Sequence, residues 1–252
     1  RDRTDFTMEE IVEKFSVSEQ ELLSLKECCD SEGLDFTSTP FSPSELDFLV
    51  DELYAPFIKV ASMDLSNLPF LKLIGQKGKP VVLSTGLSSL WEIDQAIETL
   101  EEAGCQDIAI LHCVAIYPPN DTDVNLKRMD TLAQGYPYPV GFSDHTLGIE
   151  VAIAAVAMGA TVIEKHFTLD RSLKGPDHKA SLEPGELKEM VIAIRNIEKV
   201  ISGNGVKEPS SSEIKNIHIA RKSIHLSRDL KSGSLITEND ITPLRPGDGI
   251  CA

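Results

Sequence analysis

Two histidines follow apolar runs that are typical of neighbouring strands in one sheet. His145 comes after the run at 140–142 and His166 after the run at 161–163, with a block of small and apolar residues at 150–159 between them. Ligands bind at the carboxyl ends of parallel strands, so strand–helix–strand connectivity would bring the two imidazoles together. A lone histidine at a strand end is ordinarily a hydrogen-bonded structural residue. Two at matched positions favour a site for a divalent metal ion.

Lysine and hydroxyl side chains stand at the ends of the predicted strands. Together they could form a cradle for a phosphate or carboxylate group, although any single hydroxyl there is more typical of ordinary turn chemistry. These residues are Lys59, Ser62, Ser84, Thr85 and Ser143. Lys165 directly precedes His166, so strand alternation turns it to the opposite face, where an exterior or salt-bridged lysine is expected.

Two further residues lie on segments that follow strands. Asp177 comes after a Lys-Gly-Pro sequence, and it could hold a sugar hydroxyl or act as a base. An aspartate beside Gly-Pro is also a common turn residue. Tyr117 follows the apolar run that ends at Cys113, and it could line a substrate site or pack beneath its loop.

The elements that position these residues alternate along the chain. Apolar runs separated by amphipathic helical segments indicate a parallel α/β sheet with helical crossovers. Polar residues or histidines end every run, which fits a barrel, where all strands end at one mouth, better than a doubly wound sheet. A complete barrel has eight strands, so either two lie outside this sequence or the sheet is open. The six predicted strands are 34–39, 57–62, 80–86, 107–113, 140–142 and 161–163, and the predicted helices are 40–54, 69–77, 89–104 and 150–159.

The two ends of the chain differ from this repeating middle. Residues 1–33 have a helical pattern with capped starts at Thr7–Glu10 and Ser18–Glu21. Residues 203–217 are polar and contain Gly, Pro and Ser, which predicts a linker. Residues 218–252 combine an alternating strand pattern, a turn and a helix cap at Thr237, but they are too few for an independent core. We therefore predict domains at 1–202 and 218–252.

Composition limits the class of protein and its partners. The chain has 252 residues, of which 41% are hydrophobic, and a net charge of −16, which argues against nucleic acid and anionic membranes as partners. Five cysteines, an odd number without a Cys-X-X-Cys spacing, predict reduced thiols and a cytoplasmic protein. We expect no signal peptide, and the apolar block at 151–163 is too short to span a bilayer.

Four motifs together resemble the sialic acid synthase family. They are Ser143-Asp144-His145-Thr146, Glu164-Lys165-His166-Phe167, the sequence from Gly175 to Pro184, and Arg245-Pro246-Gly247. The resemblance implies a (β/α)₈ barrel followed by a small domain similar to type III antifreeze protein. It also implies an enzyme that condenses phosphoenolpyruvate with an N-acetylated amino sugar and releases phosphate.

The resemblance also implies roles for individual residues. His145 and His166 would hold Mn²⁺ or Mg²⁺, which would polarise the aldehyde of the open-chain sugar. Arg245 would reach into the active site of a partner subunit in a domain-swapped homodimer. Residues that match phosphoenolpyruvate-binding positions are Thr39, Lys59, Ser62, Ser84 and Ser143, and those that match sugar-binding positions are Asp64, Tyr117 and Asp177.

This sequence departs from the family pattern in three places. The family's first two strands, which carry a Glu-Ile-Gly and Asn-His pattern and a lysine, have no counterpart here, and the antifreeze-like domain is shorter. Ala115 stands where several members have Asn. We therefore expect a barrel without its first two strands, trimmed relative to an active parent. A silent sugar-binding relative and a Schiff-base aldolase using Lys59 or Lys165 remain alternatives, and the acceptor sugar stays open.

Overall fold

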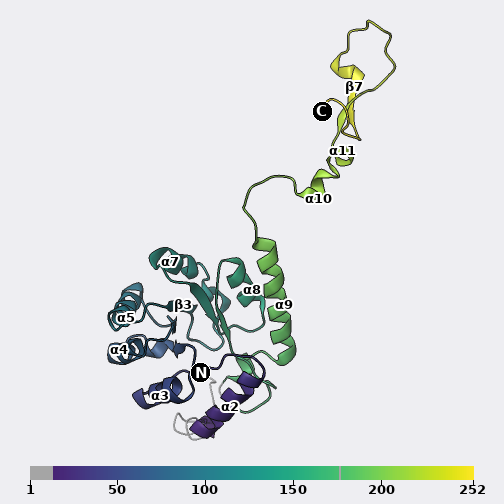
Figure 1. Ribbon diagram of the computed structural model, residues 1–252. Coiled ribbons are helices and arrows are strands. Elements are labelled where there is room, and N and C mark those ends of the chain that lie inside the picture. The colour runs from purple at the N-terminus through teal and green to yellow at the C-terminus, as the bar shows by residue number, and fades with distance from the viewer. Residues whose placement is uncertain (1–13, 176) are drawn as a thin grey trace. The chain divides into compact units, whose positions relative to one another are not determined.

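The structure is a computed structural model that describes residues 14–175 and 177–252. The chain divides into two compact units, Arg1–Ser202 and Gly203–Ala252, which we describe separately (Figure 1). The helix start predicted at Thr7–Glu10 lies outside the described residues. None of the helices in the described ranges combines the length and apolar character that crossing a membrane requires. All five cysteines are free thiols.

The first unit is built on a five-stranded sheet whose strands follow one another in chain order. Each neighbouring pair is parallel, which confirms the predicted α/β class with crossovers between strands. The strands are β1 (Ile58–Val60), β2 (Val81–Ser84), β3 (Ile108–Cys113), β4 (Val140–Asp144) and β5 (Ile163–Lys165).

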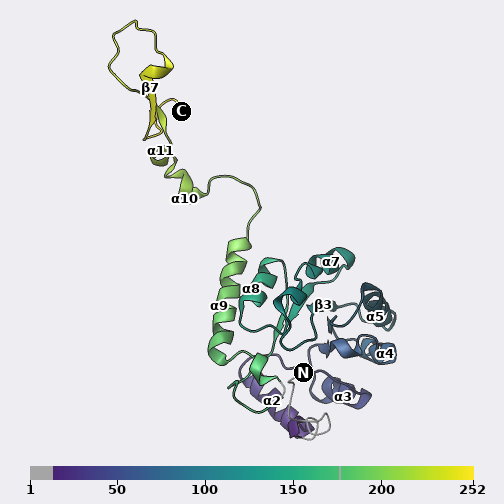
Figure 2. The same ribbon diagram turned by 180° about the vertical axis from the view of Figure 1, so that it is seen from behind.

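Helices connect and cover these strands. They are α2 (Glu19–Ser31), α3 (Pro43–Asp47), α4 (Leu68–Gln76), α5 (Leu90–Glu102), α6 (Asp121–Val124), α7 (Arg128–Gly135), α8 (Glu150–Ala157) and α9 (Pro184–Ile201), with a π-helical turn η1 (Phe48–Glu52) and 3₁₀ turns η2 (Ser62–Asp64) and η3 (His178–Ala180). Figures 1 and 2 show α3, α4, α5, α7, α8 and α9 in an arc around the outside of the sheet. This is the arrangement of a partial (β/α) barrel. The two missing strands remain a prediction.

The helix starts follow from local sequence. Ser89 caps α5 by accepting a hydrogen bond from the Glu92 N–H, while the Glu92 carboxylate accepts one from the Ser89 N–H. Ser18 and Glu21 form the same box at α2, as predicted. The buried face of α5 repeats at helical spacing, and its members are Ile93, Ala96, Ile97 and Leu100. Burying each large side chain stabilises the fold by roughly 1.5–3 kcal/mol, so this face fixes α5 on the sheet.

The predicted strand at 34–39 is wrong. These residues form no helix or strand, although they lie beside β1, where the Thr37 hydroxyl donates to the Phe57 carbonyl at 2.8 Å. The backbone of β1 pairs with β2 alone. A strand requires ladder hydrogen bonds with a neighbour, and here one side-chain contact replaces them.

The second unit contains an antiparallel pair of strands, β6 (Ser223–Leu226) and β7 (Ile241–Leu244). The predicted cap at Thr237 is confirmed, because it forms a capping box with Asp240 at the 3₁₀ turn η4 (Glu238–Asp240). Helix α10 (Ser211–Ile214) lies inside the predicted linker and α11 (Ile217–Ala220) begins at its end, so that segment is not uniformly extended. The antifreeze-like assignment of this unit remains a prediction.

Candidate active site at the carboxyl ends of the strands

A cavity of about 470 Å³ opens where the strands of the first unit end. The residues that line it come from all five strands or from the loops that follow them. Those that the sequence singled out as site residues are Lys59, Ser62, Ser84, Tyr117, Ser143, His145 and His166. Residues spread over more than one hundred positions of the sequence therefore meet in one cavity, as parallel topology requires.

Lysine and serine side chains form one wall of the cavity. The buried Lys59 ammonium on β1 donates to the Ser84 hydroxyl on β2 at 2.8 Å. The Ser62 hydroxyl accepts from the Gly86 backbone N–H at 2.9 Å. A cation beside hydroxyls and a backbone donor can hold a phosphate or carboxylate oxygen. We call this group of Lys59, Ser62, Ser84 and the neighbouring Ser143 the anion cradle.

Glu164 lies inside this cradle, and the sequence analysis assigned it no role. Its carboxylate accepts a hydrogen bond from the Ser143 hydroxyl at 2.6 Å and lies 3.3 Å from the Lys59 ammonium. Strand alternation could have predicted that Glu164 faces the cavity, because it lies two residues before His166 and side chains two apart in a strand share a face. The anion cradle therefore contains its own carboxylate.

The two histidines lie close together beside the cradle. Their ring centroids are 5.2 Å apart. Nδ1 of His145 lies 2.9 Å from the Val114 carbonyl oxygen, which only accepts, so Nδ1 carries the proton and Nε2 keeps a free lone pair. Burial lowers the pKa of His145, which favours the neutral ring.

This donor set fits a divalent metal ion with open coordination positions. The neutral His145 ring offers Nε2, and His166 adds a second imidazole. Within the described residues, no group of three or more His, Cys, Asp or Glu side chains is arranged to hold a metal. Water or substrate oxygens would therefore complete the coordination.

An aromatic ring covers the histidine pair. The Tyr117 ring centroid lies 3.9 Å from that of His145 and 5.3 Å from that of His166, nearly perpendicular to the second ring. Tyr117 therefore lines the cavity and packs against the histidines at the same time. Its contact with a substrate stays a prediction.

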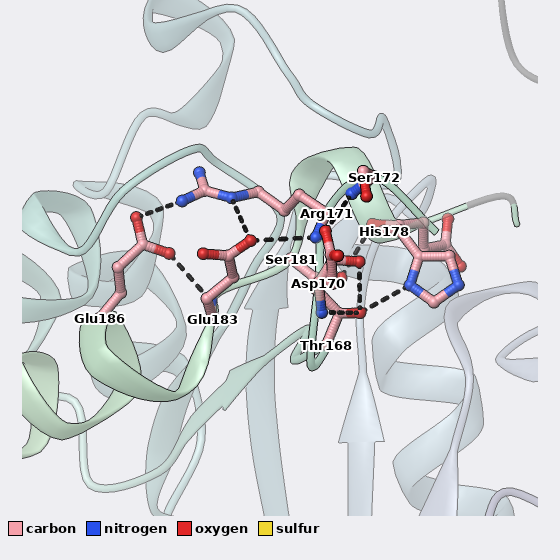
Figure 3. Close-up of polar contacts among 9 residues, drawn as sticks. Thr168, Asp170, Arg171, Ser172, His178, Ser181, Glu183 and Glu186 are labelled. Carbon is pink, nitrogen blue, oxygen red and sulfur yellow. Dashed lines mark hydrogen bonds and ion pairs between the residues drawn. The ribbon is translucent and has the colours of Figure 1, made fainter. Parts of the chain in front are cut away.

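Asp177 lies at the edge of the histidine pair on the loop after β5. Its carboxylate is 3.9 Å from Nδ1 of His166. The rest of the loop is held by local polar contacts, which Figure 3 shows from Thr168 to Glu186. The Arg171 guanidinium contacts Glu186 at 2.7 Å, and the Thr168 hydroxyl lies 2.7 Å from Nδ1 of His178. Asp177 itself is held on its C-terminal side, where its carbonyl accepts from the Ser181 hydroxyl at 2.8 Å.

Lys165 forms a salt bridge, one of the two arrangements predicted for it. Its ammonium lies 2.7 Å from the Asp144 carboxylate, and both side chains are almost completely buried. Lys165 also lines the cavity, although strand alternation predicted that it would face away from it.

Five predicted site residues do not line the cavity, namely Thr39, Asp64, Thr85, Asp177 and Arg245. Asp177 lies beside His166, and the buried Thr85 hydroxyl donates to the Leu111 carbonyl at 2.9 Å. Thr39 lies at the end of the segment that forms no strand, and Asp64 accepts from the Asn67 side chain in the turn after β1. Arg245 is exposed and belongs to the second unit.

Fold and cavity together define an α/β-barrel type of protein with a lysine–serine cluster beside a histidine pair at the strand ends. The family model that matches residues 1–207 is described as the NeuB family. The chain therefore belongs to the NeuB family, which confirms the resemblance to sialic acid synthases and identifies it as a transferase of the synthase type.

Two curated relatives carry a named activity that bears on the substrate. An N,N'-diacetyllegionaminic acid synthase from Campylobacter jejuni is 46% identical over 92% of this chain and 68% of that protein. A protein of the same name from Legionella pneumophila is 43% identical, over 97% of this chain and 69% of that protein. Among solved structures, an N-acetylneuraminic acid synthetase from Leptospira borgpetersenii has a TM-score of 0.77 and 38% identity, over 82% of this chain and 72% of that one.

Proposed function

We propose that this protein condenses phosphoenolpyruvate with an N-acetylated amino sugar to form a nonulosonic acid. A carbon–carbon bond forms between C3 of phosphoenolpyruvate and the sugar aldehyde carbon, water adds at C2, and phosphate leaves. The observation that carries the proposal is that the Lys59–Ser84 contact of the anion cradle and the His145–His166 pair line the same cavity.

The cradle side would bind phosphoenolpyruvate. Lys59 supplies the positive charge, and the hydroxyls of Ser62, Ser84 and Ser143 donate hydrogen bonds to its oxygens. Glu164 already contacts Lys59 and Ser143, so an entering anion has to exchange these contacts for its own. Thr39 stays a proposed binding residue on the resemblance alone.

The histidine side would bind the aldehyde end of the sugar. His145 and His166 would hold a divalent ion, which as a Lewis acid polarises the aldehyde oxygen. Nitrogen donors favour Mn²⁺ over the harder Mg²⁺. Tyr117, Asp177 and, on the resemblance alone, Asp64 would contact sugar hydroxyl or acyl groups.

The remaining cavity wall supports a 2,4-diacetamido-2,4,6-trideoxy sugar as the acceptor. That wall includes Ala61, Met63, Leu87 and Ala115, whose apolar side chains suit methyl and acetyl groups. The cationic side chains among the lining residues are Lys59, which would bind phosphoenolpyruvate, and Lys165, which pairs with the buried Asp144. Neither is then left for the phosphate of a sugar phosphate, which disfavours such an acceptor. The names of the Campylobacter and Legionella relatives point to the same acceptor.

Product mass analysis tests this proposal. The intact protein is incubated with phosphoenolpyruvate, Mn²⁺ and one of three acceptors: N-acetylmannosamine, its 6-phosphate or the diacetamido sugar. We expect one condensation product and equimolar phosphate with the diacetamido sugar, and loss of both after chelation. Binding of the sugar without any product would instead support a silent sugar-binding protein.

A further inference from the structure

A buried ion pair connects β4 and β5 directly before the two histidines. Asp144 and Lys165 are partners in the last register pair of these strands. Their charged groups lie 2.7 Å apart, and their side chains are 0% and 3% exposed. The ladder of backbone hydrogen bonds ends here, so the next residue on each strand, His145 or His166, lies beyond it.

Thr146 joins this ion pair to the turn that carries His145. The other oxygen of the Asp144 carboxylate accepts from the Thr146 N–H at 2.8 Å and from its hydroxyl at 2.7 Å. The Lys165 ammonium also donates to the Thr146 carbonyl at 2.6 Å. His145 is thus the middle residue of a turn whose two ends are held by one carboxylate and one ammonium.

We infer that the buried network of Asp144, Thr146 and Lys165 positions the two imidazoles for the metal ion, an inference that rests on the proposed function. Lys165 connects the backbone just before His166 to the turn around His145, so the two rings keep one relative placement. The network also keeps the His145 ring within reach of the Val114 carbonyl. Because Nδ1 donates to that carbonyl, the lone pair of Nε2 is left available for a metal ion. Asp144, Thr146 and Lys165 are therefore positioning residues.

Stability alone is a poor explanation for this arrangement. Two buried charges lose their hydration, and well-packed apolar residues of similar volume often replace such pairs without loss of stability. Here each charged group instead makes several directed hydrogen bonds to the same turn. Such outer-shell contacts orient metal-binding histidines.

The test compares a variant that neutralises the pair with one that removes a distant ion pair. Asp144→Asn/Lys165→Met keeps the volumes similar and leaves no unpaired charge. Thr146→Val removes one hydroxyl donor only. Lys77→Met is the matched control, because Lys77 forms ion pairs with Asp47 and Asp51 away from the cavity.

Two measurements are made on the intact protein. Electron paramagnetic resonance of free Mn²⁺ gives the dissociation constant, and ¹⁵N imidazole spectra of the metal-free protein report which nitrogen of His145 carries its proton. For the double variant we expect a folded protein whose Mn²⁺ affinity is about 10- to 100-fold weaker and whose His145 signal is displaced. Thr146→Val should change in the same direction, and Lys77→Met should match the wild type.

A folded double variant with wild-type Mn²⁺ affinity and an unchanged His145 signal overturns the inference. If the double variant does not fold, Thr146→Val decides, and wild-type behaviour there overturns it equally. A wild-type protein that binds no Mn²⁺ contradicts the proposed function. In that case the imidazole spectra still decide whether the network orients His145.

Discussion

At the scale of the residue, the anion cradle is notable for its internal carboxylate. Glu164 accepts from Ser143 and pairs with Lys59, the two groups best suited to hold a phosphate. The glutamate side chain is 40% exposed while the lysine is only 11% exposed, so the carboxylate faces the open cavity and the ammonium lies beneath it. The Glu164 carboxylate therefore competes with an entering anion for Lys59 and Ser143.

Glu164→Gln is expected to strengthen binding of phosphoenolpyruvate in the absence of sugar. Removing the carboxylate leaves the Lys59 charge without its anionic partner, and charge-assisted hydrogen bonds contribute about 1.5–3 kcal/mol. Isothermal titration calorimetry should show a several-fold lower dissociation constant. Glu98→Gln, on the exposed face of α5, is the control and should bind as the wild type does. Weaker binding in Glu164→Gln would show that the carboxylate assists the anion.

His112 is expected to make stability depend on pH. Burial lowers its pKa in the folded protein, so the ring stays neutral where an unfolded histidine, with a pKa of about 6.5, takes up a proton. Because the unfolded chain then binds more protons, stability falls as pH drops below about 6.5 and levels off below the folded pKa.

Urea unfolding between pH 7.5 and 5 measures this effect. His112→Phe should flatten the decline, because it removes one group that titrates differently in the two states. It should also lower stability at pH 7.5, since the Val124 carbonyl loses a donor at 2.7 Å. His218→Phe, at an exposed position, is the control. An unchanged pH profile in His112→Phe would assign the decline to other groups.

At the scale of the element, close packing determines how β4 sits between its neighbours. A Cβ atom added at Gly141 would lie 2.5 Å from the Val162 carbonyl oxygen and 2.6 Å from a methyl carbon of Leu111. Both distances are below van der Waals contact, so this position requires glycine. The two strand ends that carry Ser143 and His166 keep their spacing because this contact is tight.

Gly141→Ala is therefore expected to destabilise the first unit. Overpacking of a core costs about 1–3 kcal/mol, and thermal unfolding should show a lower midpoint. Gly135→Ala is the matched control, because nothing lies within 4 Å of its added Cβ and it lies in helix α7. Alanine there should be neutral or stabilising by about 0.5–1 kcal/mol. Equal midpoints for the two variants would contradict the packing argument.

At the scale of the whole molecule, the predicted role of Arg245 in a partner's active site involves both units. Arg245 belongs to Gly203–Ala252, whereas the cavity belongs to Arg1–Ser202. The planar guanidinium suits recognition of acyl or hydroxyl oxygens. The proposed role of Arg245 in a partner's active site therefore depends on a two-fold dimer in which each second unit covers the other cavity.

Mixing two inactive variants tests this arrangement. His166→Ala removes a proposed metal ligand, and Arg245→Ala removes the proposed donor from the second unit. If the arginine acts across subunits, heterodimers should regain one complete site in two, and phosphate release should recover partially. No recovery after subunit exchange, confirmed independently, would show that Arg245 acts within its own subunit or not at all.

Local pattern alone determined the class of fold and half of the residues that line the cavity. Parallel strands end at one edge, and alternation defines which side chains share a face. Lys59, Ser143 and His145 could therefore be placed at the cavity before any contact was known, and the family follows from the motifs around them.

Only the tertiary structure decided which segments pair as strands and which side chains meet across them. Residues 34–39 have a strand pattern but no ladder neighbour, so they form no strand. Alternation places Glu164 on the same face as His166, but its contacts with Lys59 and Ser143 depend on how three strands align, which no local pattern encodes. The same holds for the salt bridge of Lys165, because burial and a partner 21 residues away are properties of the packed sheet.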